Sequence, residues 1–227
     1  MKKLDFKEIF DRYNPEQIIE TLAPFLTDNR KLRISETLQS RIHSIHVAME
    51  NPADIHNALA IVRSGEALGI SNMHIIREKP KNHRSARTCR GGYRWTDLRY
   101  HPTFENFKDD MRQKGFLLAG ACLTNEMTLE ELPVDKPLCL LFGNEHRGLS
   151  EEALQSCDFH YTIPMHGMLE SLNLSVSAAI SLYETLKRKR DLLNASGDLS
   201  REELLKEQAR YYINAAKPRV SQTILKL

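Results

Sequence analysis

Polar side chains gather in three short motifs, and the first of them is suited to holding negative charge. Residues 56–63 contain Asn57 and Arg63, six positions apart. A guanidinium is effectively never deprotonated, so Arg63 is better suited to stabilising an anion than to removing a proton by itself. At about 100° per residue the two side chains do not share one helix face, so periodicity alone gives no reason to pair them.

The second and third motifs follow predicted strands. A buried apolar strand ends at Gly143 and leads into a polar loop that contains Glu145. Another strand leads into a loop with Ser171 and Asn173 at the start of a helical stretch. Ligands of α/β sheets bind outside the carboxyl ends of the strands, so both loops are candidates for a binding site.

Each motif also has an ordinary structural interpretation. Asn57, Arg63 and Asn173 suit a solvent-facing helix surface, and residues 143–150 suit a plain strand-to-helix turn. Ser150 and Ser171 are acceptable helix N-caps. No single motif therefore decides the function.

Short apolar runs alternate with helical stretches through most of the chain. We predict strands at 44–49, 73–76, 95–98, 116–122, 138–142 and 159–163, and helices at 57–68, 104–114, 150–156 and 172–190. Gly69 is expected to close the first of these helices. The alternation predicts an α/β fold, a mostly parallel sheet with helices on both faces.

Helix signals also flank this region. Asn14 before Pro15 predicts a helix start, and Asp28 is a candidate cap for a second helix. Ser200 with Glu203 predicts a capping box for a final helix. We divide the chain into an N-terminal helical extension (1–41), a main domain (42–190), and a C-terminal helix and tail (191–227).

The helix predicted at 172–190 carries one apolar stripe along its length. The stripe suits either a buried core or a subunit interface. Its members are Leu172, Val176, Ala179, Ile180, Tyr183 and Leu186.

Composition favours a cytoplasmic protein. The four cysteines form no CxxC pattern, which argues against a zinc site and against a secreted disulfide framework, so we expect no metal. The start of the chain lacks the apolar segment of a signal peptide, and no apolar run is long enough to cross a bilayer. We therefore expect no membrane partner.

Positive charge is concentrated although the net charge is only +2. Residues 77–100 carry eight Lys or Arg against two acidic residues, with aromatic side chains interleaved, and residues 187–190 are all basic. Such stretches suit a phosphate backbone and unpaired bases, but a solvated surface is an equally ordinary interpretation.

The usual nucleotide fingerprints are missing from the chain. Gly143 and Gly148 have P-loop spacing, but Leu149 stands where the phosphate-binding lysine is required. No GxGxxG pattern follows a predicted strand, and HExxH and GxSxG are absent. A P-loop NTPase and a dinucleotide-dependent dehydrogenase are therefore disfavoured.

In their order and spacing, the three motifs resemble the SpoU (TrmH) class of RNA methyltransferases. The patterns are N-x5-R, F-G-x-E-x-x-G and I-P-M-x-G-x-x-x-S-L-N-x-S, and they look most like the tRNA guanosine branch. The resemblance covers about Arg41 to Arg190. It implies a homodimeric ribose 2′-O-methyltransferase of the SPOUT superfamily that uses S-adenosylmethionine. It also implies a deep C-terminal trefoil knot, which pattern reasoning would not predict because chains are normally unknotted.

The resemblance also implies roles for individual residues. Arg63 matches the arginine proposed to activate the ribose 2′-hydroxyl, and we expect Asn57 to orient it. Glu145, Ser171 and Asn173 are expected to shape the junction of the cofactor site and the dimer interface. The backbone groups expected to bind the cofactor are those of Leu123, Gly143, Ile163, Met165 and Leu172. The residues expected to contact RNA are Arg84, Arg87, Arg90, Arg94, Lys187, Arg188 and Arg190.

Three departures from the branch pattern lower the positive charge near the expected pocket. Asp54 stands in a run that is usually basic, His146 replaces a usual lysine, and Glu170 replaces a neutral residue. They leave the cofactor unaffected but bear on the substrate. A guanosine at position 18 of the tRNA D-loop is the expected target, and another tRNA ribose or an rRNA ribose is the alternative.

Two other functions compete with methyl transfer. A catalytically silent RNA-binding protein on the same fold is disfavoured because Arg63 and the Ser-Leu-Asn at 171–173 are present. A different α/β transferase or dehydrogenase is disfavoured by the missing glycine fingerprints.

Overall fold

The computed structural model describes residues 6–77, 92–123, 127–216, 221 and 223 of the chain. They form two compact units. The larger unit is Ile42–Ser196, and the smaller one comprises the described residues of Met1–Arg41 and Gly197–Leu227.

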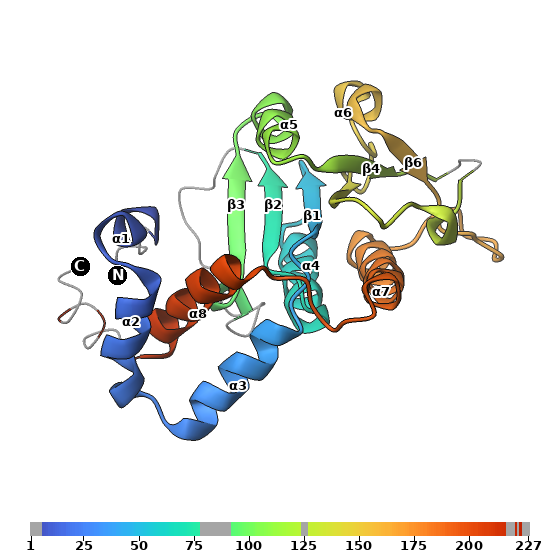
Figure 1. The fold of residues 1–227 in the computed structure, drawn as a ribbon. Helices are drawn as coiled ribbons and strands as arrows, with labels where there is room; N and C mark the ends of the chain where they lie inside the picture. Colours follow the sequence, from blue (N-terminus) through green and yellow to red (C-terminus); the bar gives the residue numbers. More distant parts are fainter. Residues whose placement is uncertain (1–5, 78–91, 124–126, 217–220, 222, 224–227) are drawn as a thin grey trace. The chain divides into compact units, whose positions relative to one another are not determined.

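A sheet of six parallel strands forms the centre of the larger unit (Figure 1). All six predicted strands are confirmed, although β3 begins two residues later than expected and continues to His101. The strands lie in the order β3-β2-β1-β5-β4-β6. Their bounds are β1 (Ile45–Glu50), β2 (Asn72–Ile76), β3 (Asp97–His101), β4 (Leu117–Ala121), β5 (Leu138–Phe142) and β6 (Phe159–Tyr161).

Helices cover both faces of this sheet, as predicted. Helices α4 (Ile55–Leu68) and α7 (Leu174–Leu193) pack against each other and form one apolar core with Val47 and Leu140. Helices α5 (Phe104–Gln113) and α6 (Glu151–Ser156) form a second core with Ala48 and Leu141. Successive strand residues point to opposite faces, and the central strands are apolar on both because both are covered.

The start of α7 and the direction of its apolar stripe differ from the prediction. Asn173 caps the helix by accepting from the Ser175 amide at 2.8 Å, so Ser171 is not the cap. Leu186 is buried, but Val176 and Tyr183 are 44% and 60% exposed. The buried face instead contains residues offset from the stripe, namely Leu174, Ala178, Ser181, Leu182, Thr185 and Lys189. The stripe is therefore mostly a surface of this chain.

Three short 3-10 turns complete the described structure. They are η1 (Ala23–Phe25) in the smaller unit, and η3 (Gly92–Arg94) and η4 (Leu129–Glu131) in the larger one. Gly69 ends α4 in a left-handed conformation with φ 103°, as its position in the sequence predicted.

The smaller unit is a helical assembly of α1 (Phe6–Arg12), α2 (Pro15–Leu22), α3 (Asp28–Gln39) and α8 (Arg201–Ala215). Asn14 caps α2, as predicted, and also forms a capping box with Gln17, and the capping box predicted at Ser200 is present. The cap of α3 is Thr27 rather than Asp28, because the Thr27 hydroxyl accepts from the Arg30 amide.

Helix α8 packs against α2 and α3, so the predicted N-terminal and C-terminal helices share one unit. The predicted three-part division of the chain itself stays a prediction, and most of the predicted tail lies outside the described residues. In the part of the chain that the structure describes, no helix is long and apolar enough to cross a membrane.

A row of three buried histidines crosses β1, β2 and β3 beneath α5. His74 Nδ1 lies 2.9 Å from His101 Nε2, and His74 Nε2 lies 3.1 Å from His46 Nδ1. Burial lowers the pKa of all three rings, and the nearby cations Arg99 and Lys114 lower it further. The rings are therefore neutral in the folded protein.

We predict that this row makes the larger unit unstable in acid. The unfolded chain takes up protons below the ordinary histidine pKa of 6.5, whereas the folded chain resists them. The contribution of these histidines to stability is therefore fully present above that pH and is lost as the pH falls. The free energy of unfolding should fall by up to about 1.4 kcal/mol per pH unit for each of His46 and His74.

Urea unfolding at pH 7.5 and pH 5.5 measures this effect. Fluorescence of Trp95, the one tryptophan of the chain, reports on the larger unit. The control variant His166→Gln, at an exposed position, should follow the wild type. Equal stability at both pH values would contradict the prediction.

Candidate active site

The carboxylate of Glu145 joins the loop after β5 to the start of α4. It accepts from the Ala53 amide at 2.6 Å, from the Asp54 amide at 3.3 Å and from Asn57 Nδ2 at 2.8 Å. Partial burial acts to raise the pKa of Glu145, but these hydrogen bonds outweigh it and hold the pKa below its usual value. Glu145 is therefore an anion at neutral pH, placed where the dipole of α4 favours negative charge.

Asn57 connects Glu145, in the second motif, to the third motif. Asn173 Nδ2 donates to Asn57 Oδ1 at 3.3 Å, while Asn173 Oδ1 caps α7. The structure thus brings Asn57, Glu145 and Asn173 into one hydrogen-bond network. Asn57 lies in the first turn of α4, Glu145 in the loop after β5 and Asn173 at the cap of α7, and the two bonds join positions 88 and 116 residues apart in the sequence.

The loop that carries Glu145 is tightly closed. Asn144 and Gly148 exchange two backbone hydrogen bonds, at 2.9 and 2.8 Å. A Cβ on Gly143 would lie only 2.1 Å from the backbone carbon of Gly148, so only glycine fits at this position. The close approach of Gly143 to Gly148 therefore keeps the loop tightly folded at the end of β5.

A buried carboxylate that sequence reasoning missed holds the far end of this loop. Glu50, at the end of β1, accepts from the amide and the hydroxyl of Ser150, at 2.8 and 2.6 Å. Ser150 also caps α6, as expected. The available signal was an acidic residue ending an otherwise apolar strand, with nothing in the sequence to show its partner.

Asp54, one of the departures from the branch pattern, has a structural role. It is the N-cap of α4, and its Oδ1 accepts from the His56 amide at 2.8 Å. An acid at this position therefore stabilises the helix start.

The residues expected to bind a cofactor follow β4, β5 and β6, three neighbouring strands of the sheet. Gly143 offers backbone, and the apolar side chains of Leu123 and Met165 are 66% and 37% exposed. Leu172 is also partly exposed, and Ile163 is half-buried. Open apolar side chains beside a backbone-lined loop fit a ligand with a flat apolar part and polar edges.

Arg63 and Ser171 lie apart from the network. Both are exposed, Arg63 on α4 and Ser171 in the loop before α7. Within the described residues no hydrogen bond joins Asn57 to Arg63, because Asn57 is engaged with Glu145 and Asn173. The expected orientation of Arg63 by Asn57 stays a prediction.

The residues expected to bind RNA are placed unevenly. Arg84, Arg87 and Arg90 lie outside the described residues, and Arg94 is exposed in η3. Lys187 is exposed. Arg188 donates to the Leu129 carbonyl and Arg190 to the Leu68 carbonyl, so both also hold the fold together. Their role in RNA binding stays a prediction.

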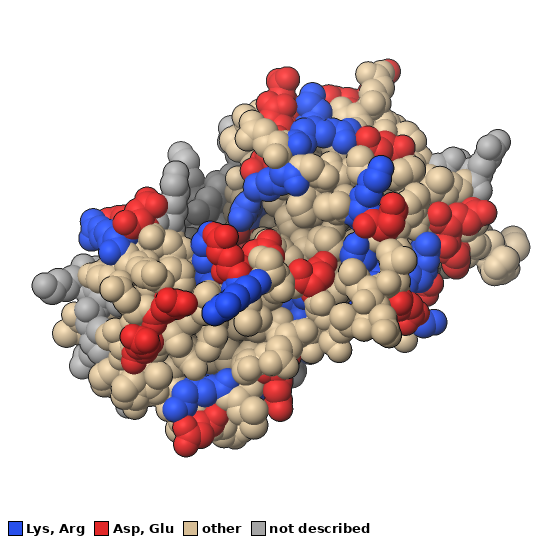
Figure 2. Space-filling view, in the orientation of Figure 1, with Lys and Arg blue, Asp and Glu red and all other residues tan. Residues whose placement is uncertain are grey.

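Charges on the surface are mixed. On the face shown in Figure 2, Lys and Arg side chains alternate with Asp and Glu instead of forming one continuous basic patch. The surface therefore does not by itself mark an RNA path on that face.

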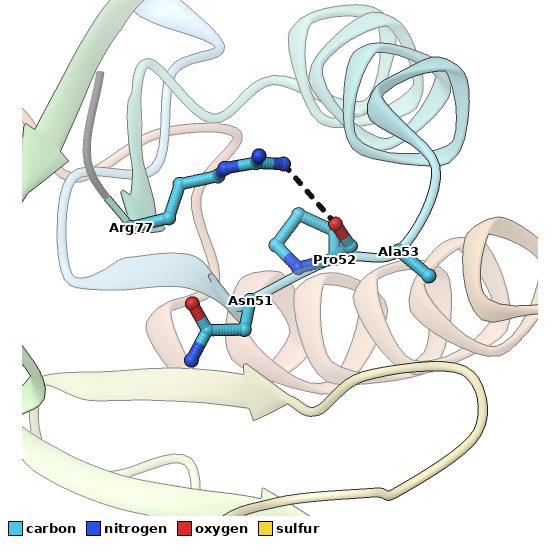
Figure 3. Close-up of a pocket in the computed structure, with 4 residues that line it drawn as sticks. All are labelled: Asn51, Pro52, Ala53 and Arg77. Carbon is cyan, nitrogen blue, oxygen red and sulfur yellow. Dashed lines mark hydrogen bonds between the residues drawn. The ribbon is translucent and has the colours of Figure 1, made fainter. Parts of the chain in front are cut away.

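A cavity of about 400 Å³ opens beside the network. Among the described residues it is lined by Asn51, Pro52, Ala53 and Arg77 (Figure 3). Arg77 Nη1 donates to the Pro52 carbonyl at 3.2 Å across the opening. Sequence reasoning counted Arg77 only as one member of a basic stretch.

One group of side chains has the composition of a metal site. Donor atoms of His74, His101 and Asp110 all lie within 4.8 Å of one another. However, the two histidines are hydrogen-bonded to each other. Asp110 forms ion pairs with Lys114 at 2.6 Å and with Arg99 at 3.7 Å. These contacts satisfy the group without an ion, and the two cations oppose one.

Comparison with known proteins confirms the resemblance inferred from the three motifs. A model of the SpoU rRNA Methylase family matches residues 44–183. The tRNA (guanosine(18)-2′-O)-methyltransferase of Borreliella burgdorferi is 32% identical over 173 residues, which cover 76% of this chain and 79% of that protein.

Solved structures agree with this match. The A. aeolicus TrmH/SpoU tRNA modifying enzyme has a TM-score of 0.70 and 30% identity, over 80% of this chain and 95% of that one. The SpoU methyltransferase AviRb from Streptomyces viridochromogenes, solved with AdoMet, shares the fold with a TM-score of 0.60 and 24% identity, over 67% of this chain and 62% of that one. The chain therefore belongs to the SpoU rRNA Methylase family.

Proposed function

We propose that this protein transfers the methyl group of S-adenosylmethionine to a ribose 2′-hydroxyl of tRNA, specifically that of guanosine 18. The carrying observation is the network of Asn57, Glu145 and Asn173, which joins the three family motifs at one edge of the sheet. Membership of the family and the activity named for the relative from Borreliella burgdorferi support the substrate. A tRNA substrate also favours the cytoplasm as the place of action.

The cofactor would be held at the ends of β4, β5 and β6. The residues proposed to hold it are Leu123, Gly143, Ile163, Met165 and Leu172. When bound, S-adenosylmethionine supplies a sulfonium methyl group that an oxygen nucleophile attacks. The absence of space for any side chain on Gly143 favours recognition through the main chain of the loop after β5.

Arg63 is the proposed catalytic residue. Its guanidinium stays protonated, so it acts by holding the 3′-phosphate and stabilising the alkoxide that forms on the ribose. The phosphate held in this way assists removal of the 2′-hydroxyl proton. Glu145 and Asn57 fix the start of α4, the helix that carries Arg63, and so position the reacting groups.

We also propose a trefoil knot formed by residues 138–190. The strand order supports it, since β5 is inserted between β1 and β4 while β6 lies outside β4. The return of α7 to pack on α4 is consistent with a chain that threads back through the loops it has just formed.

The same helix is the proposed dimer interface. Leu172, just before α7, and Val176, Ile180 and Tyr183 within it are all at least 36% exposed, although they are apolar. A contiguous exposed apolar stripe favours a protein partner, and a second copy of the chain is the partner that the family resemblance implies.

The first test is methyl transfer from labelled S-adenosylmethionine into unmodified tRNA and rRNA, with the labelled nucleoside identified. We expect 2′-O-methylguanosine in tRNA. Arg63→Ala should abolish turnover and leave cofactor affinity unchanged, because Arg63 is an exposed residue of α4 and is not among the residues proposed to hold the cofactor. No label in either RNA with the wild-type protein would contradict the proposed function, and turnover by Arg63→Ala would contradict the catalytic assignment.

Glu145→Gln tests the network. The substitution puts an NH₂ group where the Ala53 and Asp54 amides and Asn57 all donate, so at least one donor loses its acceptor. We expect kcat to fall by about tenfold, the cost of one charge-assisted hydrogen bond. Glu152→Gln, an exposed neighbour in α6, is the matched control and should keep wild-type kinetics. Wild-type kcat in Glu145→Gln would show that the network does not position the site.

Ile180→Glu tests the interface by placing a charge in the apolar stripe. We expect the wild-type protein to sediment as a dimer and Ile180→Glu as a monomer, because burying an unpaired carboxylate is costly. Leu32→Glu, at an exposed apolar position of α3 in the smaller unit, should remain dimeric. A monomeric wild-type protein would contradict the proposal.

A further inference from the structure

We propose that the cavity lined by Asn51, Pro52, Ala53 and Arg77 binds a backbone phosphate of the RNA, other than the one that Arg63 would hold. Arg77 is the residue that would hold it. This inference rests on the proposed function, because it assigns the cavity to the RNA that is methylated.

The cavity lies where α/β sheets bind their ligands. Asn51 and Arg77 are the first residues after β1 and β2, which pair in register up to Glu50 and Ile76. Backbone bonds continue beyond the strands, from the Asn51 amide to the Ile76 carbonyl and from the Arg77 amide to the His101 carbonyl, at 3.0 and 2.9 Å. The main chain therefore fixes both residues at the carboxyl edge.

Arg77 has donors available for an anion. Its guanidinium is part-buried, and in the described part of the chain its hydrogen bond runs from Nη1 to the Pro52 carbonyl. No carboxylate in the described part of the chain forms an ion pair with it, whereas Arg99 pairs with two carboxylates and Arg112 with one. A guanidinium has five N–H donors, so Arg77 retains several that match phosphate oxygens. The Pro52 bond holds the group beside the opening (Figure 3).

The cavity shares a wall with the active-site network. The Ala53 amide donates to Glu145, and the Asn51 carbonyl accepts from Asn144 Nδ2 at 2.7 Å. A ligand in the cavity would therefore lie next to the loop proposed to meet the cofactor. The hollow has a volume of about 400 Å³ and is largely open to solvent, so a phosphate of an RNA strand that runs across the surface can enter it.

Strand order separates this cavity from the proposed cofactor site. The cavity lies at the ends of β1 and β2, while the proposed cofactor residues follow β5, β4 and β6. A phosphate of the substrate is thus a better occupant than the carboxylate of the cofactor. Arg63 would hold the phosphate of the methylated nucleotide itself, and Arg77 a different phosphate of the same RNA.

Arg77→Gln tests the assignment in equilibrium binding of a tRNA transcript, which does not require turnover. We expect the Kd for tRNA to rise by about tenfold, as for one charge-assisted hydrogen bond, and the slope of log K against log salt to decrease by about one. Cofactor affinity should not change. The Kd of Arg77→Lys for tRNA should lie between those of the wild type and Arg77→Gln, because an ammonium keeps the charge without the planar donor pair.

Lys136→Gln is the matched control. It removes one positive charge at an exposed position of the same unit, just before β5 and therefore at the opposite edge of the sheet. It should leave the Kd and the salt dependence unchanged. Thermal unfolding of each variant shows whether any loss of tRNA affinity comes from a damaged fold. If Arg77→Gln is destabilised, the tRNA affinity of Arg77→Lys decides whether the charge matters, because this variant keeps it.

A substrate carrying single methylphosphonates identifies the phosphate. Neutralising the contacted phosphate should weaken wild-type binding as much as Arg77→Gln does, and should weaken Arg77→Gln no further. The cavity assignment would be overturned by an unchanged Kd for tRNA in Arg77→Gln, or by weakened cofactor binding in that variant. It would also be overturned if the loss of affinity from Arg77→Gln added to that from a methylphosphonate at every position tested. Absence of methyl transfer by the wild-type protein would instead overturn the proposed function.

Discussion

The hydrogen bonds that converge on Glu145 are the contacts on which the geometry of the site depends. One carboxylate accepts hydrogen bonds from two backbone amides and one side-chain amide at the start of α4. It thereby ties the loop after β5 to the helix that carries Arg63, and through Asn57 it reaches the cap of α7. Because the carboxylate is charged, these bonds are stronger than neutral ones and restrict the loop after β5 and the start of α4 together.

The loop that presents Glu145 is itself restricted from both ends. Gly143 approaches the main chain of Gly148 too closely for any side chain, and Glu50 holds Ser150 from the buried end of β1. A carboxylate buried in this way is stable because two donors meet it. Glu50 thus links the core to a loop that would otherwise be a flexible connection.

Strand order divides the carboxyl edge of the sheet into two regions. The ends of β4, β5 and β6 hold open apolar side chains and backbone, which suit the proposed cofactor, while the ends of β1 and β2 hold Arg77 and a polar cavity. The network of Asn57, Glu145 and Asn173 lies where these regions meet. Such a division suits a reaction that brings a cofactor and a phosphate-bearing substrate together from two sides.

Much of the fold and three members of the candidate site could be predicted from the sequence alone. Apolar runs and cap residues located the six strands and the helices from α4 to α7, since these signals depend on local spacing. The order of the three motifs indicated the family, which the comparisons confirmed. The positions of Asn57, Glu145 and Asn173 followed from that order.

The tertiary structure decided which side chains meet and which faces stay open. Hydrogen bonds between Ala53 and Glu145 and between Ser150 and Glu50 join residues about a hundred positions apart, and no local pattern encodes such a pairing. The apolar stripe of α7 could be predicted, but its direction could not, because periodicity is the same for a face that meets a core and one that meets solvent. Arg77 was one cation among many until the ends of β1 and β2 placed it beside a cavity.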